Sequence, residues 1–356
     1  MINYQLPATK GTQAGKEFFT ATIPFKFLVR MFKFDEESVP ADLRAQRKLN
    51  EQRAQAIADY ILSNQDSYVL PAITASCDRS MRFENLVPGH EVGLLSIPID
   101  ACLLINDGQH RRMGIALALR EAPELAEHSI SVTLYFDRGL RACQQMFADI
   151  NSRATKPSGS LNALYDLRNP FARWVMDILG RRPAIRCRID MENASPSKNS
   201  PHLWSLIAFH KFVGMLTGVS EKNIGRLPDL EAKTREVVEF LDALGVIPFW
   251  TPMLEGKIAA ETMREQYIIS HAVFLHALAV LGAHTADLRC LQGLAGIDPA
   301  KSSPLWQGRS VINGKMRKTS DGVNATAAVL MRFCAVSPPE LIARLDALCS
   351  QQPQAA

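Results

Sequence analysis

The stretch that organises the first half of this chain has the sequence LLINDGQHRR and spans residues 103–112. The apolar residues 101–105 predict a short buried strand, and the Asn-Asp-Gly sequence at residues 106–108 is typical of a tight turn. Residues 109–120 combine good helix formers with apolar positions at helical spacing, so they predict a helix. The local unit is therefore a strand, a turn and a helix.

The start of that helix offers hydrogen-bond donors to an anion. Backbone N–H groups are free at a helix start, Asp107 is the expected N-cap, and Gly108 lets the backbone bend closely. Two interpretations stay open: a capped helix with a solvated basic start, or a site for a phosphate or carboxylate. The candidate ligand- or phosphate-binding residues are Asp107, Gly108, Gln109, His110, Arg111 and Arg112.

The composition and the missing motifs exclude several classes of protein. No apolar run reaches the roughly 18 residues of a membrane span, and residues 1–7 do not resemble a signal peptide. The seven cysteines form no Cys-x-x-Cys pair, which favours a reducing cytoplasm over a disulfide framework or a zinc site. The chain contains no Gly-x-x-x-x-Gly-Lys-Ser/Thr, His-Glu-x-x-His or Gly-x-Ser-x-Gly motif. We therefore predict no catalytic residues and no metal ligands.

Basic residues concentrate in the second half of the chain. Residues 1–150 carry 16 Lys and Arg against 18 Asp and Glu, whereas residues 151–356 carry 24 against 18. Such asymmetry fits a surface that meets phosphate groups, although ordinary solvated faces explain it equally well. The alternation in residues 181–188 predicts a strand with one basic face, and the Asn-Gly pair at residues 313–314 predicts a hairpin. The DNA-binding candidates are Arg181, Arg182, Arg186, Arg188, Arg309, Lys315, Arg317 and Lys318.

A second possible site element follows a predicted helix at residues 139–152. The polar and basic residues at and after its end are Asp149, Asn151, Arg153 and Lys156. Asp149 and Asn151 suit C-terminal capping as well as a site, whereas Arg153 and Lys156 are better placed to contact a ligand or DNA.

The pattern along the chain predicts an α+β protein with two domains. We expect a flexible arm at residues 1–20, a mixed α/β domain at residues 21–160, and a mainly α-helical domain at residues 161–350. A disordered tail is expected at residues 351–356. Apolar residues that largely alternate with basic ones predict that residues 23–34 form a half-buried strand.

The sequence DGQHR at residues 107–111 resembles the signature of the DGQHR-domain family. Residues 53–62, 70–76 and 145–154 also fit that family, which makes residues 21–160 its domain. Within the family the chain is most similar to DndB, the regulatory proteins of DNA phosphorothioation (sulfur modification) gene clusters. This resemblance implies a cytoplasmic bacterial repressor that binds double-stranded promoter DNA of its own modification operon. It also implies that the protein accompanies the sulfur-transfer chemistry and does not perform it.

The same turn is similar to the nucleotide-binding corner of the ParB/sulfiredoxin superfamily. That similarity implies an alternative function, a nucleotide-binding switch or an NTPase or nicking component that takes ATP or CTP. Arg111 would then neutralise phosphate charge, His110 would orient a phosphate or water, and Asp107 would cap the turn or help hold a metal ion. A second alternative is a non-catalytic scaffold subunit that contacts other phosphorothioation proteins, and the sequence is compatible with a homo-oligomer.

Overall fold

The protein consists of two compact units, Met1–Thr155 and Lys156–Ala356. The division falls close to the boundary expected near residue 160. The computed structural model describes residues 2–33, 50–136, 145–146, 149–150, 157–285 and 287–350. The expected tail at residues 351–356 lies outside them.

The N-terminal unit is built on one mixed eight-stranded sheet with the strand order β3-β7-β4-β8-β2-β1-β6-β5. Its strands are β1 (Asn3–Gln13), β2 (Lys16–Pro24), β3 (Phe32–Lys33), β4 (Ile73–Cys77), β5 (Arg82–Asn85), β6 (Val92–Pro98), β7 (Leu103–Asp107) and β8 (Ser129–Phe136). Its helices are α1 (Phe25–Met31), α2 (Glu51–Ser63) and α3 (Gln109–Glu121), followed by the 3₁₀ turn η2 (Pro123–Glu127). The β3–β7 and β4–β8 pairs are parallel, and the other pairs are antiparallel.

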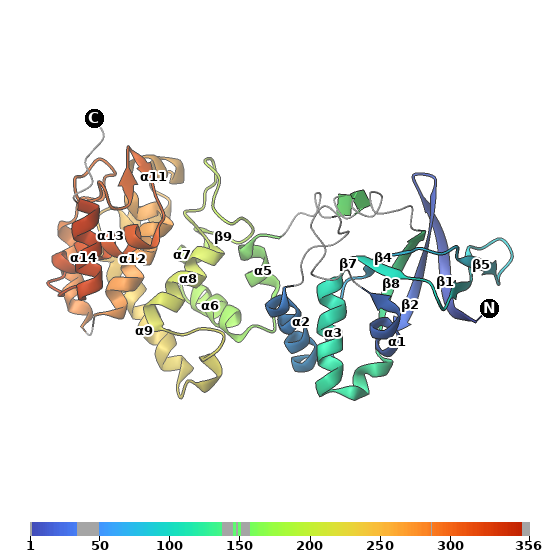
Figure 1. Cartoon of the computed structure of the whole chain (residues 1–356). Helices are drawn as coiled ribbons and strands as arrows, with labels where there is room; N and C mark the ends of the chain where they lie inside the picture. The colour runs from blue at the N-terminus through green and yellow to red at the C-terminus, as the bar shows by residue number, and fades with distance from the viewer. Residues whose placement is uncertain are drawn as a thin grey trace. The chain divides into compact units, whose positions relative to one another are not determined.

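Helices α1, α2 and α3 cover one face of this sheet (Figure 1). Every second residue of β4 and β8 is apolar and buried in the core beneath these helices, as Ile73 and Val132 are. Because successive strand residues point to opposite faces, the residues between them lie on the other side of the sheet. Helices α2 and α3 approach closely at Gly114, where an added Cβ would lie 2.6 Å from Cγ2 of Ile57.

Two expectations for the start of the chain are wrong. Residues 3–13 are not part of a flexible arm, because β1 pairs along its length with β2 and β6. Residues 23–34 do not form one strand, because β2 ends at Pro24 and α1 follows. The buried residues of α1 are Phe25, Leu28 and Met31, which lie three apart and share a helix face. This spacing outweighs the alternation that suggested a strand.

The C-terminal unit is mainly helical. Its helices are α5 (Gly159–Tyr165), α6 (Pro170–Gly180), α7 (Pro183–Arg186), α8 (Leu206–Thr217), α9 (Leu230–Ala243), α10 (Trp250–Glu255), α11 (Ala260–Gln266), α12 (Ala272–Ala283), α13 (Ser320–Phe333) and α14 (Glu340–Ser350). The 3₁₀ turns are η3 (Ile224–Arg226), η4 (Leu244–Val246), η5 (Ile268–Ser270) and η6 (Leu288–Gly296), and the short strands are β9 (Ile189–Asp190), β10 (Trp204–Ser205), β11 (Val311–Ile312) and β12 (Lys315–Met316).

Helix α12 is the centre of this unit. Its residues from Val273 to Leu281 are all buried, and it packs against α8 and α13 (Figure 1). A helix that is apolar all round belongs in a core. The predicted combination of a mixed α/β half and a mainly helical half is therefore confirmed. Among the described residues, no helix is long and apolar enough to cross a membrane.

The predicted basic strand at residues 181–188 is wrong. Residue 181 follows the end of α6, and residues 183–186 form the short helix α7. Pro183 occupies the first turn of α7, where its missing N–H costs no helical hydrogen bond. The strand β9 begins only at Ile189.

Candidate functional site

The turn at residues 107–109 has the predicted strand–glycine–helix geometry. Strand β7 ends at Asp107, and Gly108 has φ of +106° and ψ of 14° before α3 begins at Gln109. A Cβ at Gly108 would lie 2.8 Å from Cγ1 of Ile73 and 3.0 Å from Nη2 of Arg111. The expected N-cap is wrong, because Gly108 takes the N-cap position and no side chain caps the helix. Glycine is therefore needed here by the backbone conformation and by the space around it.

Replacing Gly108 by alanine should lower the free energy of unfolding of the N-terminal unit by about 2 kcal/mol, because left-handed strain and overpacking against Ile73 add. The matched control is Gly89→Ala, which has φ of +77° but open space around it. Hydrogen exchange of sheet amides in the N-terminal unit measures both variants. Equal losses in the two variants would contradict the steric role of Ile73.

The two arginines of the turn bind protein groups. Nη2 of Arg111 donates to Oδ2 of Asp107 at 2.6 Å and to the Ala72 carbonyl at 3.0 Å. The Arg111 side chain is only 16% exposed. Nη2 of Arg112 donates to the Val29 carbonyl, and burial lowers the pKa of this arginine below its ordinary value. The guanidinium groups thus fasten α3 to β4 and α1.

The other two polar side chains of the motif, His110 and Gln109, also face the protein. Nε2 of His110 accepts a hydrogen bond at 3.1 Å from the backbone N–H of Asn50, which is the N-cap of α2. Accepting at Nε2 leaves the proton of a neutral imidazole on Nδ1. Gln109 is 4% exposed. In this geometry the motif holds α2, α3 and the sheet together. Contrary to what the sequence suggested, its side chains bind other parts of the protein and are not presented outward to an anion.

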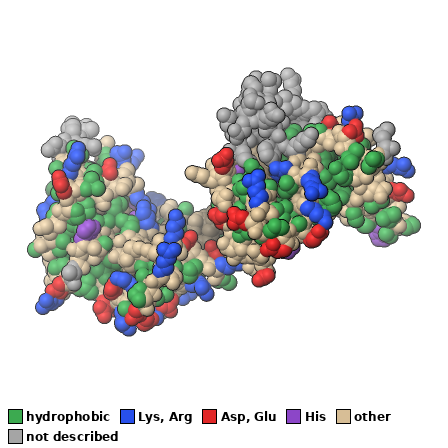
Figure 2. All heavy atoms as spheres, turned by 60° about the horizontal axis from the view of Figure 1, so that its bottom comes forward, with side chains coloured by type: hydrophobic (Ala, Val, Ile, Leu, Met, Phe, Trp, Pro, Cys, Tyr) green, Lys and Arg blue, Asp and Glu red, His purple; other side chains and the backbone are tan. Residues whose placement is uncertain are grey.

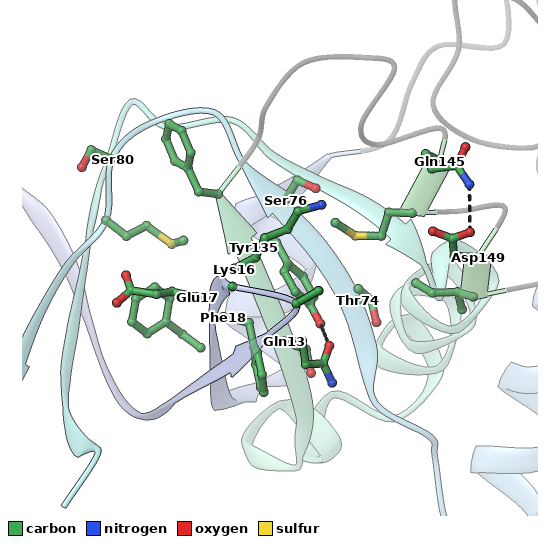
Figure 3. A pocket seen from close by; sticks show the side chains of 18 residues that line it. Gln13, Lys16, Glu17, Phe18, Thr74, Ser76, Ser80, Tyr135, Gln145 and Asp149 are labelled. Carbon is green, nitrogen blue, oxygen red and sulfur yellow. Dashed lines mark hydrogen bonds between the residues drawn. The ribbon is translucent and has the colours of Figure 1, made fainter.

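Of the second predicted element, only Asp149 is a described residue. Oδ1 of Asp149 accepts from Nε2 of Gln145 at 2.8 Å, and both side chains line a cavity on the sheet (Figure 3). Asn151, Arg153 and Lys156 lie outside the described residues.

Arg181 and Arg182 are held in ion pairs on the surface. Arg181 binds both carboxylate oxygens of Glu231, at 2.6 and 2.8 Å, and also pairs with Asp177. Hydrogen bonding to Glu231 raises the pKa of Arg181 above its ordinary value. Arg182 makes two hydrogen bonds to Asp242. Their charge is therefore largely compensated within the protein.

Arg188 and Arg309 have structural partners as well. Arg188 donates to the carbonyls of Leu254 and Pro201, at 3.0 and 3.3 Å. Nε of Arg309 lies 2.5 Å from Oδ1 of Asp346, and these two side chains are only 13% and 10% exposed. Four of the eight DNA-binding candidates are thus engaged by the chain itself.

The remaining candidates are exposed, and three of them lie together. The predicted hairpin is confirmed: β11 and β12 pair across Asn313 and Gly314, whose φ values of 51° and 71° match a type I′ turn. Lys315, Arg317 and Lys318 are exposed on or just after it. We call residues 311–318 the basic hairpin. Arg186 is also exposed, on α7.

The fold adds one lysine to the basic hairpin that the sequence did not single out. Lys211 is an exposed residue of α8, and its positive charge acts on the Lys318 ammonium group. Partial burial, and then the charge of Lys211, lower the pKa of Lys318. Within the described parts of the chain, neither Lys211 nor any of the three hairpin cations forms an ion pair with a carboxylate. No sequence signal joins two lysines that are more than 100 residues apart.

The charge on the surface is otherwise mixed. On the face drawn in Figure 2, Lys and Arg side chains lie among Asp and Glu side chains and form no single continuous patch. Net charge alone therefore does not locate a phosphate-facing surface, and the basic hairpin is distinguished by three exposed cations within four residues, Lys315, Arg317 and Lys318.

Comparison with known proteins gives a family. No curated protein and no solved structure matches the chain at a significant level. A family model described as DndB, DNA-sulfur modification-associated, matches residues 6–337, which is nearly the whole chain. The resemblance inferred from the DGQHR sequence is thereby confirmed. The chain belongs to the DndB family of DNA-sulfur modification-associated proteins.

Proposed function

We propose that this protein is a DNA-binding transcriptional regulator that represses a bacterial DNA phosphorothioate modification operon. Its family supports a role in DNA sulfur modification. The basic hairpin supports contact with DNA phosphates, since exposed Lys and Arg on a loop are suited to backbone contacts. Such a repressor would act on double-stranded promoter DNA in the cytoplasm.

The observation that carries the proposal is the group of exposed cations on the basic hairpin, Lys315, Arg317 and Lys318. Lys211 of α8 adds a charge that acts on Lys318, and like charges that repel each other raise the free energy of the protein unless an anion lies nearby. A phosphate group bound between them would relieve that repulsion. The N-terminus of α13, which begins two residues after Lys318, adds partial positive charge.

The geometry gives less support to a nucleotide-binding switch. A phosphate at the DGQHR turn would have to compete with Asp107 and the Ala72 carbonyl for Arg111, and with the Val29 carbonyl for Arg112. The likeness to the ParB/sulfiredoxin superfamily is therefore proposed for the fold of the N-terminal unit alone. Contact with other phosphorothioation proteins, or between copies of this chain, is compatible with the regulator role.

The test is binding to promoter DNA of the protein's own operon, measured by fluorescence anisotropy at several salt concentrations. The triple variant Lys315→Ala, Arg317→Ala, Lys318→Ala should bind about tenfold more weakly. The slope of log K against log salt should become shallower by about 2 to 3, because each phosphate contact contributes about 0.9. Binding to a random DNA fragment of equal length measures the part of the affinity that does not depend on sequence.

The matched control is Arg181→Gln with Arg182→Gln, which removes two surface arginines that are already paired. These changes should leave both affinity and salt slope close to those of the unmodified protein. No binding to the promoter fragment at low salt would refute the proposal. An unchanged salt slope in the hairpin variant would remove the basic hairpin as the DNA-contacting surface.

A further inference from the structure

A large cavity lies on the sheet of the N-terminal unit, on the face away from α1, α2 and α3. Its volume is about 990 Å³, at the upper end of the range of about 300–1,000 Å³ typical of small-molecule sites. The side chains between the core positions of β4 and β8 line it, namely Thr74, Ser76, Thr133 and Tyr135 (Figure 3). These residues form a polar floor over an apolar core.

A buried amide next to this floor has an unused donor. The Ser76 hydroxyl donates to Oδ1 of Asn106 at 2.7 Å, which places the Asn106 side chain on the cavity side of the sheet. Asn106 is fully buried, and its Nδ2 has no hydrogen-bond partner. Buried amide groups normally have partners, because an unpaired donor loses its hydration without compensation. Asn106 is not among the residues that line the cavity, so it acts on the floor through Ser76, whose hydroxyl it holds in place.

One wall of the cavity is aromatic. Phe18 and Tyr135 pack against each other with ring centroids 5.7 Å apart, and Phe136 is 50% exposed beside them. The Tyr135 hydroxyl donates to Oε1 of Gln13 at 2.8 Å (Figure 3). Burial raises the pKa of Tyr135, so this hydroxyl stays protonated and the ring stays neutral. Such a wall suits the face of a flat ring.

The charge of the lining disfavours a phosphate-rich ligand. Among the described lining residues, Lys16 is the only cation, and the acids Glu17 and Asp149 accompany it. Arg111 and Arg112 do not line the cavity, because their guanidinium groups bind Asp107, Ala72 and Val29. Among these described residues a triphosphate would meet two acids and one cation, whereas an uncharged molecule would not be repelled.

We propose that this cavity binds an uncharged, planar heterocycle of the nucleoside class. The base lies against the Phe18–Tyr135 wall. The hydroxyl groups of Thr74 and Thr133 hydrogen-bond the sugar or the base edge. The site is separate from the basic hairpin, so its occupation is measured without DNA and stands or falls independently of DNA binding.

The experiment measures the binding of adenosine, guanosine, cytidine and thymidine, and of the matching triphosphates, to the full chain by isothermal titration calorimetry. At least one nucleoside should bind at up to millimolar concentration, and its triphosphate should bind at least tenfold more weakly. Thr133→Val, which removes one hydroxyl at constant volume, should weaken nucleoside binding by about tenfold or more. Thr74→Val, at the other threonine of the floor, should do the same.

The matched control is Thr20→Val. Thr20 is half-buried, pairs with Thr133 across β2 and β8, and does not line the cavity. This variant should bind the nucleoside as the unmodified protein does. The proposal is overturned if no nucleoside binds, or if Thr133→Val and Thr20→Val behave alike. It is also overturned if triphosphates bind more tightly and Arg111→Ala abolishes that binding, which would place the ligand at the DGQHR turn.

Discussion

Lowering the pH from 7 to 5 is expected to reduce the free energy of unfolding of the C-terminal unit by about 4 kcal/mol, about 2 kcal/mol for each of two buried histidines. Burial lowers the pKa of His276 to about 4, and the charges of Lys318 and Lys211 lower it as well, against the opposing effect of the Ala208 carbonyl. Burial, and then Lys301, lower the pKa of His271 to about 4.

The direction follows from which state binds the proton. In the unfolded chain these histidines take up protons below about pH 6.5, whereas in the folded unit they stay neutral until about pH 4. The contribution of these two histidines to the free energy of unfolding is therefore fully present above about pH 6.5 and is lost as the pH falls from there towards 4. In His276, Nε2 bonds to the Ala208 carbonyl at 3.0 Å and Nδ1 has no partner, so an added proton would be buried without an acceptor.

Urea unfolding followed by tryptophan fluorescence measures this effect. The chain's four tryptophans, at positions 174, 204, 250 and 306, all lie in the C-terminal unit, so the signal reports that unit. The control is His276→Gln, which retains an amide donor for the Ala208 carbonyl and does not titrate. Its stability should change with pH about half as much. Equal pH dependence in both proteins would show that His276 does not titrate as described.

Replacing Asp346 by asparagine is expected to destabilise the C-terminal unit by about 3 kcal/mol. The side chain of Asp346, on α14, is 10% exposed, and its two carboxylate oxygens bind Arg309 at 2.5 Å and Arg332 at 2.6 Å. Removing one partner of a buried pair leaves an uncompensated charge, which costs about 3–5 kcal/mol. We expect a loss at the lower end of this range because the Arg332 side chain is 51% exposed, so water can solvate its charge once the partner is removed. The Arg309 side chain is buried and cannot be solvated in this way.

The matched control is Asp242→Asn, which removes the carboxylate partner of Arg182. The Asp242 side chain is 57% exposed and that of Arg182 is 28% exposed, so water screens the pair and the loss should stay below about 1 kcal/mol. Urea unfolding by tryptophan fluorescence serves for both variants. Similar losses at the two positions would contradict the claim that burial makes the Asp346 pairs different. A large effect would also loosen α14 from the base of the basic hairpin, through Arg309.

Local interactions explain which parts of the fold were predictable. The strand, turn and helix at residues 103–121 follow from neighbouring residues, because apolar runs, turn residues and helix formers act over a few positions. The Asn-Gly hairpin at residues 313–314 was predictable for the same reason. The edge of the sheet was not: β1 is an ordered strand because β2 and β6 supply its hydrogen bonds, and β6 is about 90 residues away in the chain.

The sequence by itself determined the family signature, the bend at Gly108 and the surplus of cations in the second half of the chain. The tertiary structure alone decided which of those cations are free. It turned Arg111 towards Asp107, gave Arg181 to Glu231 and Arg309 to Asp346, and left Lys318 beside Lys211. The physical reason is that a charge is neutralised by whatever lies within a few ångströms of it. For most of these pairs, that distance is set by the packing of segments far apart in the chain.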